Sequence, residues 1–241
     1  MSNNLIIAQE ENEDKEFEEV IQEFFITESV YPQEKNEIQF TNYDYMYLYD
    51  WQKDYWGSFE IEYGITDRFQ VSSGIGYRYM SIQDSTNRKG FTNLEVGALY
   101  NFYQSYRFSA SLSLETELPT GAEVFGESEM DLEPNLILAW QIGRMQTHVN
   151  LGMEFEPEAL DEYGLFYNIA VLYPINNFVP TLEFNVYKED DENNMFITPG
   201  FVYKINRFEI GSAVPVNISS GEPKMGIIFD LIFEFEPGED D

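Results

Sequence analysis

The stretch GSFEIEYGITDRFQVSSGIGYRY, from Gly57 to Tyr79, decides the fold because its residues alternate between apolar and polar. One face of its first half consists of Phe59, Ile61, Tyr63 and Ile65. The opposite face of the same half consists of Ser58, Glu60, Glu62 and Gly64. After a turn at Thr66-Asp67-Arg68 the alternation resumes and continues to Tyr79. A period of two predicts a hairpin of two β-strands, each with one oily and one polar face.

Such an oily face lies either inside a soluble β-sandwich or outside a membrane barrel, where the polar face lines the lumen. The chain has 241 residues with 17% aromatic content, including 17 Tyr and 20 Phe. Aromatic residues in such numbers suit membrane interfaces. No apolar run reaches the roughly 18 residues that a spanning helix needs. A membrane form of this chain would therefore cross the bilayer as strands.

The charge balance limits which partners the chain can be expected to bind. The chain carries 13 Lys and Arg against 44 Asp and Glu, a formal net charge of −31. A basic patch for nucleic acid or for an anionic membrane surface is therefore not expected. The chain has no cysteine, which excludes disulfides and thiolate metal sites. No cofactor motif is present, and we expect no cofactor.

The first 35 residues differ from the rest, and we predict an N-terminal arm over 1–35 followed by a barrel over 36–241. Leu5 to Ala8 resembles the end of a signal peptide, a remnant with cleavage after Ala8. From Glu10 to Phe25 the segment is acidic, with apolar residues at helical spacing. It is either a short amphipathic helix or a mobile arm, and a helix that caps or plugs the barrel is a third alternative. The apolar residues are Phe17, Val20, Ile21, Phe24 and Phe25.

From about Asn36 onward the pattern predicts only strands and turns. The first strand, Ile38 to Tyr49, has an ambiguous facing, because four tyrosines on one face oppose Met46 and Leu48. With the opening hairpin, about twelve strands result, each long enough to cross a bilayer when tilted. The others are Leu94 to Phe102, Phe108 to Leu118, Leu132 to Ile142, Thr147 to Phe155, Leu165 to Tyr173, Phe178 to Val186, Met195 to Tyr203, Phe208 to Val216 and Met225 to Phe235.

The connections alternate in length. Tight turns are expected near Thr66-Asp67, Gln104-Ser105, Gly143, Asn176-Asn177 and Asn206. Longer polar loops are expected at Ile82 to Gly90, Pro119 to Asp131, Glu156 to Tyr163, Lys188 to Asn194 and Ser219 to Lys224. Short periplasmic turns and longer external loops are typical of outer-membrane barrels. We therefore predict that the tight turns and both termini face the periplasm.

Aromatic residues flank each tight turn and predict an interfacial girdle, because amphipathic rings settle at the headgroup level. The alternative is ordinary hairpin chemistry, with turn-forming residues between β-forming ones. The predicted girdle consists of Tyr63, Phe69, Tyr100, Phe108, Trp140, Tyr173, Phe178, Tyr203 and Phe208.

Five short phrases resemble one known family: EIEYGITDRFQV, LEVGALY, ELPTG, ITPGFVYKI and the final FDLIFEFE. They are similar to bacterial outer-membrane proteins named after the MetA pathway of phenol degradation, and the resemblance covers roughly Phe25 to Phe235. It implies an outer-membrane barrel of the transporter type, with some members proposed to pass small hydrophobic molecules. It implies no catalytic residues. In this chain Phe235 is followed by an acidic tail, Glu236 to Asp241, where outer-membrane strands often end on an aromatic residue.

Alternation places one histidine, one arginine and many carboxylates on the polar face. Crowded carboxylates attract cations, so the lumen is either water-filled and cation-favouring or a narrow, merely solvated polar interior. The predicted lumen-lining residues are Glu60, Glu62, Arg78, Glu95, Glu115, Glu133, His148, Glu154, Glu183, Glu209 and Asp230.

Three acidic loops form a second cluster. Flexible carboxylate loops can share divalent ions such as Ca²⁺, but no spacing matches an EF-hand, and plain solvated charge is the simpler interpretation. Whether the chain binds a metal is left open by the sequence. The residues are Glu123, Glu127, Glu129, Asp131, Glu156, Glu158, Asp161, Glu162, Glu189, Asp190, Asp191 and Glu192.

An enzyme hypothesis has little support. His148 is the sole histidine, and a barrel lipase would need a serine within reach of such a base. No nucleophile motif accompanies it, so a hydrogen-bonded structural histidine is favoured. Pairs of acids on adjacent strands are expected by chance in so acidic a chain and do not indicate a glycosidase.

The sequence thus predicts an all-β protein: a transmembrane, antiparallel, up-and-down β-barrel of about 12 strands in the bacterial outer membrane, in contact with lipid and lipopolysaccharide. The predicted function is a passive, porin-like channel or transporter for small hydrophobic, aromatic or cationic solutes. The alternatives are a structural or adhesive outer-membrane protein without transport, and a soluble barrel that binds a small apolar ligand.

Overall fold

The computed structural model describes residues 17–49, 51–83, 86–125, 130–157, 159, 163–189 and 192–235. These residues form one sheet of thirteen strands. The strands are β1 Ile38–Leu48, β2 Gln52–Thr66, β3 Phe69–Ile82, β4 Arg88–Ser105, β5 Phe108–Leu118, β6 Asp131–Ile142, β7 Met145–Phe155, β8 Tyr163–Leu172, β9 Phe178–Glu189, β10 Glu192–Ile205, β11 Phe208–Ala213, β12 Val216–Asn217 and β13 Met225–Phe235.

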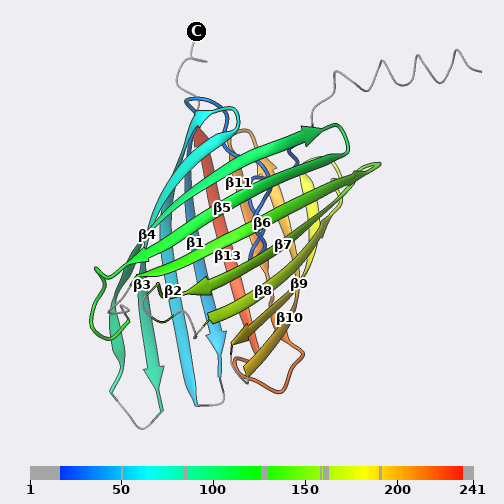
Figure 1. Cartoon of the computed structure of the whole chain (residues 1–241). Helices are drawn as coiled ribbons and strands as arrows, with labels where there is room; N and C mark the ends of the chain where they lie inside the picture. Colours follow the sequence, from blue (N-terminus) through cyan, green and yellow to red (C-terminus); the bar gives the residue numbers. More distant parts are fainter. Residues whose placement is uncertain are drawn as a thin grey trace, which may run out of the picture.

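The sheet closes into a barrel because β1 pairs antiparallel with both β2 and β13 (Figure 1). β11 and β12 follow one another between β10 and β13, so they are two parts of one interrupted strand. Pro215 lies at the interruption and has no backbone N–H to donate to the ladder. The barrel formed by the described residues therefore has twelve strands around its circumference, which confirms the predicted fold class.

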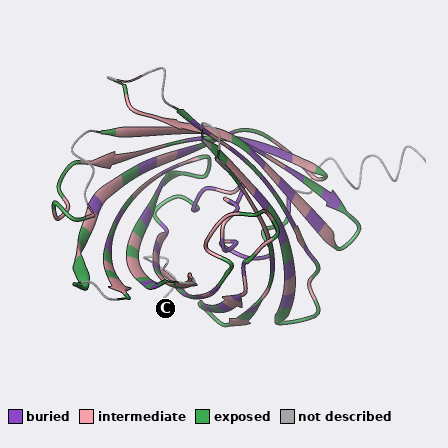
Figure 2. Cartoon of the chain, turned by 90° about the horizontal axis from the view of Figure 1, so that it is seen from below, coloured by how far each residue is buried: buried purple, intermediate pink, exposed green. Residues whose placement is uncertain are grey.

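The two faces of each strand lie as alternation predicts for a membrane barrel. In β2 the outward side chains Phe59 and Ile61 are 45% and 40% exposed, whereas the inward Glu62 is 6% exposed. Figure 2 shows the ring of strands with buried and exposed residues alternating along them. Apolar side chains therefore cover the outside of the barrel, as a hydrocarbon environment requires.

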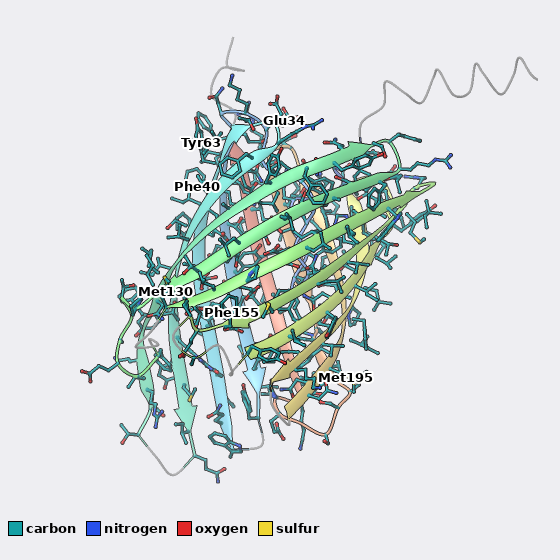
Figure 3. The ribbon with its side chains drawn as sticks, viewed as in Figure 1. Glu34, Phe40, Tyr63, Met130, Phe155 and Met195 are labelled. Carbon is teal, nitrogen blue, oxygen red and sulfur yellow. The ribbon has the colours of Figure 1, made fainter. Side chains whose placement is uncertain are left out.

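One end of the barrel carries the tight turns. Gly143, Asn176 and Asn206 adopt φ angles of +65°, +55° and +54° at these turns, the left-handed conformation that glycine and asparagine tolerate best. The start of β1 and the end of β13 lie at the same end, because Ile38 pairs with Phe235 and with Tyr63. In Figure 3 Tyr63 and Glu34 lie at this upper end, and Met195 lies near the lower end.

The lower end, called the loop end here, differs from the prediction at two connections. The loop expected from Ile82 to Gly90 is shorter, because β4 already begins at Arg88. A long loop was expected from Lys188 to Asn194, but β9 and β10 extend to Glu189 and Glu192 and leave only 190–191 between them. That expectation is wrong. The polar residues here can still pair as strands, because the hydrogen bonds between strands join backbone groups and do not depend on side-chain polarity. Both strands are also longer than the minimum that crosses a bilayer, so their ends need no apolar side chains.

The N-terminal helix is also corrected for the part that the structure describes. Residues 17–35 contain no helix and run through the barrel interior as irregular chain. The helical spacing of their apolar residues arises instead from two buried clusters. Among the described residues, no helix has the length and apolarity to cross a membrane.

Candidate functional site

Residues 17–35, called the plug here, enter the lumen from the tight-turn end and return to it. Near that end the Lys204 Nζ donates to the carbonyl oxygen of Val20 at 2.8 Å. At the deepest point the Glu28 N–H donates to the Asn150 Oδ1 at 2.7 Å. On its way out the plug crosses β2 so closely that a Cβ at Gly64 would lie 1.8 Å from the carbonyl oxygen of Glu34. Figure 2 shows this chain inside the ring of strands.

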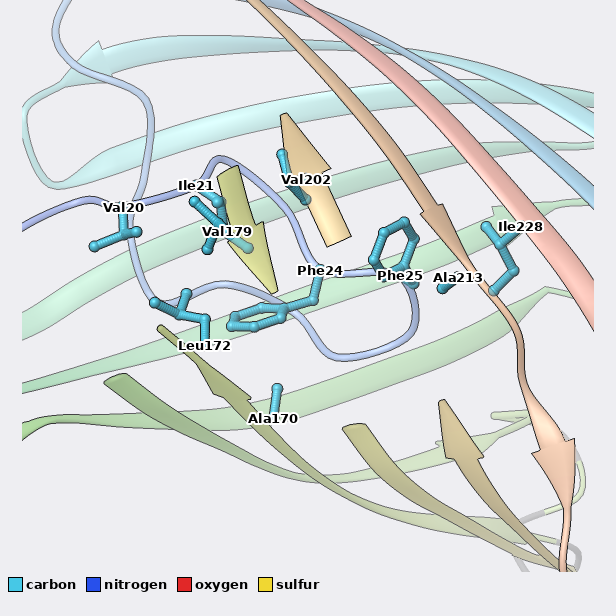
Figure 4. Packing of buried hydrophobic residues seen from close by; sticks show 10 residues of the cluster. All are labelled: Val20, Ile21, Phe24, Phe25, Ala170, Leu172, Val179, Val202, Ala213 and Ile228. Carbon is cyan, nitrogen blue, oxygen red and sulfur yellow. The ribbon is translucent and has the colours of Figure 1, made fainter. Parts of the chain in front are cut away.

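Apolar side chains of the plug pack against an apolar patch on the inner wall. Phe24 and Phe25 are each 2% exposed, and Ile21 is fully buried. Figure 4 shows how they face the wall residues Ala170, Leu172, Val179, Val202, Ala213 and Ile228. Full burial of one such side chain contributes about 1.5–3 kcal/mol. The tight-turn half of the lumen therefore has a core of its own.

A carboxylate on the wall anchors the backbone of the plug. Glu183 accepts the N–H groups of Phe25, Ile26 and Thr27 at 2.9, 3.1 and 2.8 Å, and the Thr27 hydroxyl at 2.8 Å. Successive backbone N–H groups form an anion-binding concavity, and bonds to a charged acceptor are the stronger ones. Glu183 is thus fully engaged and is not a free charge in a conduction path.

A second carboxylate acts in the same way nearer the tight turns. Glu209 accepts the N–H of Gln22 at 3.0 Å and forms an ion pair with Lys204 at 2.9 Å. Glu209 is 2% exposed. Burial of this charge is compensated because a cation and a backbone donor both face it.

Neutral polar residues complete the seat of the plug. The carbonyl oxygen of Val30 accepts from the hydroxyl of Ser111, and the Gln33 N–H donates to the Gln70 Oε1 at 2.6 Å. The Tyr31 hydroxyl donates to the Gln146 Oε1 at 2.7 Å. Buried backbone groups need partners, and here the lumen wall supplies them in place of secondary structure.

The open parts of the lumen beside the plug and beyond its tip are together called the acidic chamber here. Three cavities lie in it, of about 270, 100 and 200 Å³. The carboxylates that line them are Glu23, Glu28, Glu60, Glu62, Glu95, Glu115, Glu117, Asp131, Glu133 and Glu154. Burial raises the pKa of the Glu28 carboxyl, and burial together with the charges of Glu62 and Glu60 raises the pKa of Glu23. A buried carboxyl that gains no cation keeps its proton more readily.

Tyrosines from β1 line this part of the lumen, which settles the facing that the sequence left ambiguous. Tyr43 and Tyr47 each line a cavity, and Tyr45 packs against the plug. Tyr45 also stacks on Trp56 with ring centroids 5.0 Å apart. Met46 is 44% exposed on the outside. Only the neighbouring strands determine which face is inside, so the sequence of β1 alone could not have identified this stripe.

The structure separates the predicted lumen residues into three groups. Glu183, Glu209, Asp230 and His148 are buried in the tight-turn half. Arg78 forms an ion pair with the buried Asp54, with its Nε 3.0 Å from the Asp54 Oδ1. The remaining six lie on the acidic chamber: Glu60, Glu62, Glu95, Glu115, Glu133 and Glu154.

His148 lies in an aromatic cage. Its ring centroid is 4.8 Å from that of Phe24, 5.6 Å from that of Tyr31 and 6.4 Å from that of Phe17. The Tyr31 hydroxyl is 3.5 Å from its Nε2. Tyr31 and the two phenylalanines come from the plug, so the surroundings of His148 are those of a residue that holds the plug.

The predicted girdle residues lie around the tight-turn end. Phe69 pairs with Tyr100, Phe108 with Trp140, and Phe178 with Tyr203 in register. Seven of the nine side chains are among the exposed large hydrophobic residues: Tyr63, Tyr100, Trp140, Tyr173, Phe178, Tyr203 and Phe208. Their role at a membrane interface stays a prediction.

The acidic loops lie mostly outside the described residues. Glu127, Glu129, Glu158, Asp161, Glu162, Asp190 and Asp191 are not described, nor are the side chains of Glu189 and Glu192. Glu123 is exposed, and Asp131 lines a cavity of the acidic chamber. Cation binding by these loops stays a prediction, as does any part of the tail after Phe235.

Solved structures with a similar fold are outer-membrane proteins. The COG4313 outer membrane channel from Pseudomonas putida F1 has a TM-score of 0.67 and 10% identity, with 86% of this chain and 98% of that chain covered. The KdgM porin in complex with disordered oligogalacturonate has a TM-score of 0.54 and 15% identity, over 83% of this chain and 98% of that chain. At such identities the likeness shows the fold alone.

Sequence comparison gives the family. No curated protein matches the chain. The sequence profile of the family described as "Putative MetA-pathway of phenol degradation" matches residues 24–220, which covers most of the barrel and the second half of the plug. The chain therefore belongs to the MetA-pathway-of-phenol-degradation family of β-barrel proteins.

Proposed function

We propose that this protein is a non-enzymatic channel of the bacterial outer membrane that passes small cationic or aromatic solutes. One observation supports it above the others: the plug fills only part of the lumen and leaves cavities lined by carboxylates and tyrosines beside it and beyond its tip. A structural or adhesive barrel has no need of such a chamber. The fold shared with outer-membrane channels agrees with this proposal.

The chemistry of the chamber favours cations. Fixed negative charge within low-dielectric walls concentrates counter-ions and repels anions. No Lys or Arg is among the residues that line the three described cavities. The chamber should therefore pass K⁺ or an organic ammonium ion in preference to an anion.

Aromatic solutes are favoured by a separate observation. The tyrosine stripe Tyr43, Tyr45 and Tyr47 presents a row of rings on the inner wall, with successive centroids 6.1 and 6.3 Å apart, the first pair tilted and the second stacked. Ring faces attract both aromatic groups and cations. A phenolic or aromatic ammonium compound would satisfy both features of the chamber.

Reversal potentials in planar bilayers under a KCl gradient test the selectivity. We expect a small conductance with cations preferred, and a weaker preference in the variant with Glu95→Gln, Glu133→Gln and Glu154→Gln together. High salt should screen the preference because exposed charges in a wet lumen are screened. A matched triple variant at the exposed Glu34, Asp67 and Glu123 should keep it. An inserted barrel that passes no ions would contradict the proposal and favour a structural role.

Localisation has its own test. The substitution Ile61→Arg, on the outward face, should weaken membrane insertion by about 2–4 kcal/mol if the residue lies near mid-bilayer. The substitution Glu62→Gln, on the inward face, should not weaken insertion. Refolding into lipid vesicles under denaturant titration measures both. A protein that is folded and monodisperse in water without detergent would instead support a soluble barrel with an apolar ligand.

A further inference from the structure

Three carboxylates from three different segments converge at the tip of the plug. Glu28 belongs to the plug, Glu115 to β5 and Glu133 to β6, and one oxygen from each lies within 4.8 Å of the other two. Ca²⁺ takes oxygen ligands at about 2.3–2.6 Å, so two ligands on opposite sides of one ion are about 5 Å apart. The spacing of the three oxygens is therefore that of ligands around one shared ion.

The Glu28 carboxylate is held in place before any ligand arrives. Its main chain is fixed by Asn150, which accepts the Glu28 N–H at 2.7 Å and donates to the Glu28 carbonyl at 3.2 Å. Its Oε2 accepts from the Ser113 hydroxyl at 2.6 Å and from the Asn135 Nδ2 at 2.8 Å. Preorganised ligands lose less conformational entropy on binding, which favours a site over a loose cluster.

An unpaired oxygen beside the cluster points to a ligand independently of its acidity. Asn135 is 3% exposed, and its Oδ1 has no hydrogen-bond partner. That oxygen belongs to the same amide group whose nitrogen contacts Glu28, and Asn135 lines the same cavity as Glu28 and Glu133. Buried acceptors are nearly always satisfied, so this one lacks its partner. Amide oxygens are ordinary ligands of Ca²⁺.

The charge of the cluster favours a cation as well. Glu115 and Glu133 lie directly opposite one another on neighbouring strands, an arrangement that is unfavourable for like charges. The residues described around the three cavities supply no basic side chain. One divalent ion would neutralise two of the three carboxylates and give the Asn135 oxygen a partner.

We propose that Glu28, Glu115, Glu133 and the Oδ1 of Asn135 form a binding site for one divalent cation of the size of Ca²⁺. The ion joins the tip of the plug to β5 and β6 and so holds the plug in the lumen. This inference goes beyond the proposed channel, since the site exists whether or not the barrel conducts.

Terbium luminescence tests the site on the full-length protein, purified in detergent and stripped with a chelator. Tb³⁺ replaces Ca²⁺, and energy transfer from Tyr47 and Trp56, which line the adjoining cavities, reports its binding. We expect saturable Tb³⁺ binding that Ca²⁺ displaces, with a Ca²⁺ dissociation constant on the order of 0.1–1 mM, as in extracellular Ca²⁺ sites. Glu115→Gln with Glu133→Gln should weaken it at least about tenfold. Asn135→Ala should weaken it by a smaller factor.

The matched control is Glu95→Gln with Glu117→Gln. These two residues also lie opposite one another on adjacent strands and line the same chamber, so the control removes equal charge from the same lumen. It should keep affinity within a few-fold of the unmodified protein. Equal loss in both double variants would overturn the site in favour of diffuse attraction, and unchanged binding in the first variant would overturn it outright. The mobility shift of unboiled barrel in gels shows that each variant is folded.

Discussion

The two halves of the lumen are built from the same alternating strands, yet Glu183 and Glu209 in the tight-turn half have different partners from Glu115 and Glu133 in the loop half. In the tight-turn half, Glu183 and Glu209 each accept backbone N–H groups of the plug. In the loop half, Glu115 and Glu133 face each other and the tip of the plug across cavities. A carboxylate therefore becomes structural or functional according to whether a segment from elsewhere in the chain supplies it with donors.

The largest effect on this contrast is expected from Phe25→Ala. Phe25 is 2% exposed within the plug cluster, and removing a buried Phe side chain costs about 3–5 kcal/mol. The plug should leave its seat more often while the barrel itself stays closed. Hydrogen exchange of residues 22–28, followed by mass spectrometry, measures the opening. Phe201→Ala is the matched control, because Phe201 is 42% exposed on the outer face of β10. If residues 22–28 exchange as fast in Phe201→Ala as in Phe25→Ala, the packing argument is refuted.

A smaller effect is expected from Glu183→Gln, which keeps the shape of the side chain but not its charge. The amide would offer one acceptor oxygen to the four donors of the plug, which share two carboxylate oxygens in the unmodified protein. Charge-assisted bonds contribute about 1.5–3 kcal/mol each, so we expect the plug to loosen by roughly 2–3 kcal/mol. Exchange protection of the Phe25, Ile26 and Thr27 amides is the readout. Glu95→Gln, in the loop half, should leave that protection unchanged, and equal loss in both variants would contradict the contrast.

The smallest effect is a pH dependence at the tip of the plug. Burial raises the pKa of Glu28 above its value in water, so the seated plug takes up a proton that the released plug lacks. In chelator the seated state should therefore gain stability as pH falls through the raised pKa, and the gain should end below the ordinary pKa of a glutamate. A single group changes the seating equilibrium by at most about tenfold per pH unit.

Conductance recorded from about pH 8 to about pH 5 in single-channel experiments would show this as a decrease toward low pH. The carboxylates around Glu28 are Glu115 and Glu133 at the tip of the plug and Glu23, Glu60 and Glu62 in the adjoining cavity, and its neutral partners are Ser113 and Asn135. Glu28→Gln should remove the part of the pH dependence that belongs to the plug. A conductance that rises on acidification in the unmodified protein but not in Glu28→Gln would show the opposite sign.

Much of the barrel could be predicted from sequence because strand facing is a local property. The hairpin at Gly57 to Tyr79 shows its two faces within a few residues, and the turn at Gly143 is recognisable from glycine alone. The path of the plug is not local. Phe25 meets Glu183 across a sequence separation of 158 residues, and nothing near either residue indicates the other. The helical spacing at Val20 to Phe25 was a true sign of burial but not of a helix.

The lumen residues show the same limit. Alternation predicts equally well that Glu183 and Glu133 both point into the lumen. The two differ only because the plug donates hydrogen bonds to Glu183, whereas Glu133 lies opposite another carboxylate, Glu115. The inner apolar patch at Ala170 and Leu172 was hidden because both faces of β8 carry apolar residues near its end. Tyr45 was ambiguous for the same reason. Facing on such strands is decided by neighbours, which single-strand patterns do not contain.

Single-channel conductance of a chain that lacks residues 17–33 tests the central claim most directly. The deletion removes all of the plug except Glu34 and Lys35. It leaves β1 with its pairing to β2 and β13, so the barrel can still close. The account predicts that the deleted protein inserts normally, conducts severalfold more than the full chain and still prefers cations, because the carboxylates of the acidic chamber remain. A folded, inserted deletion variant whose conductance equals that of the full chain would contradict the account.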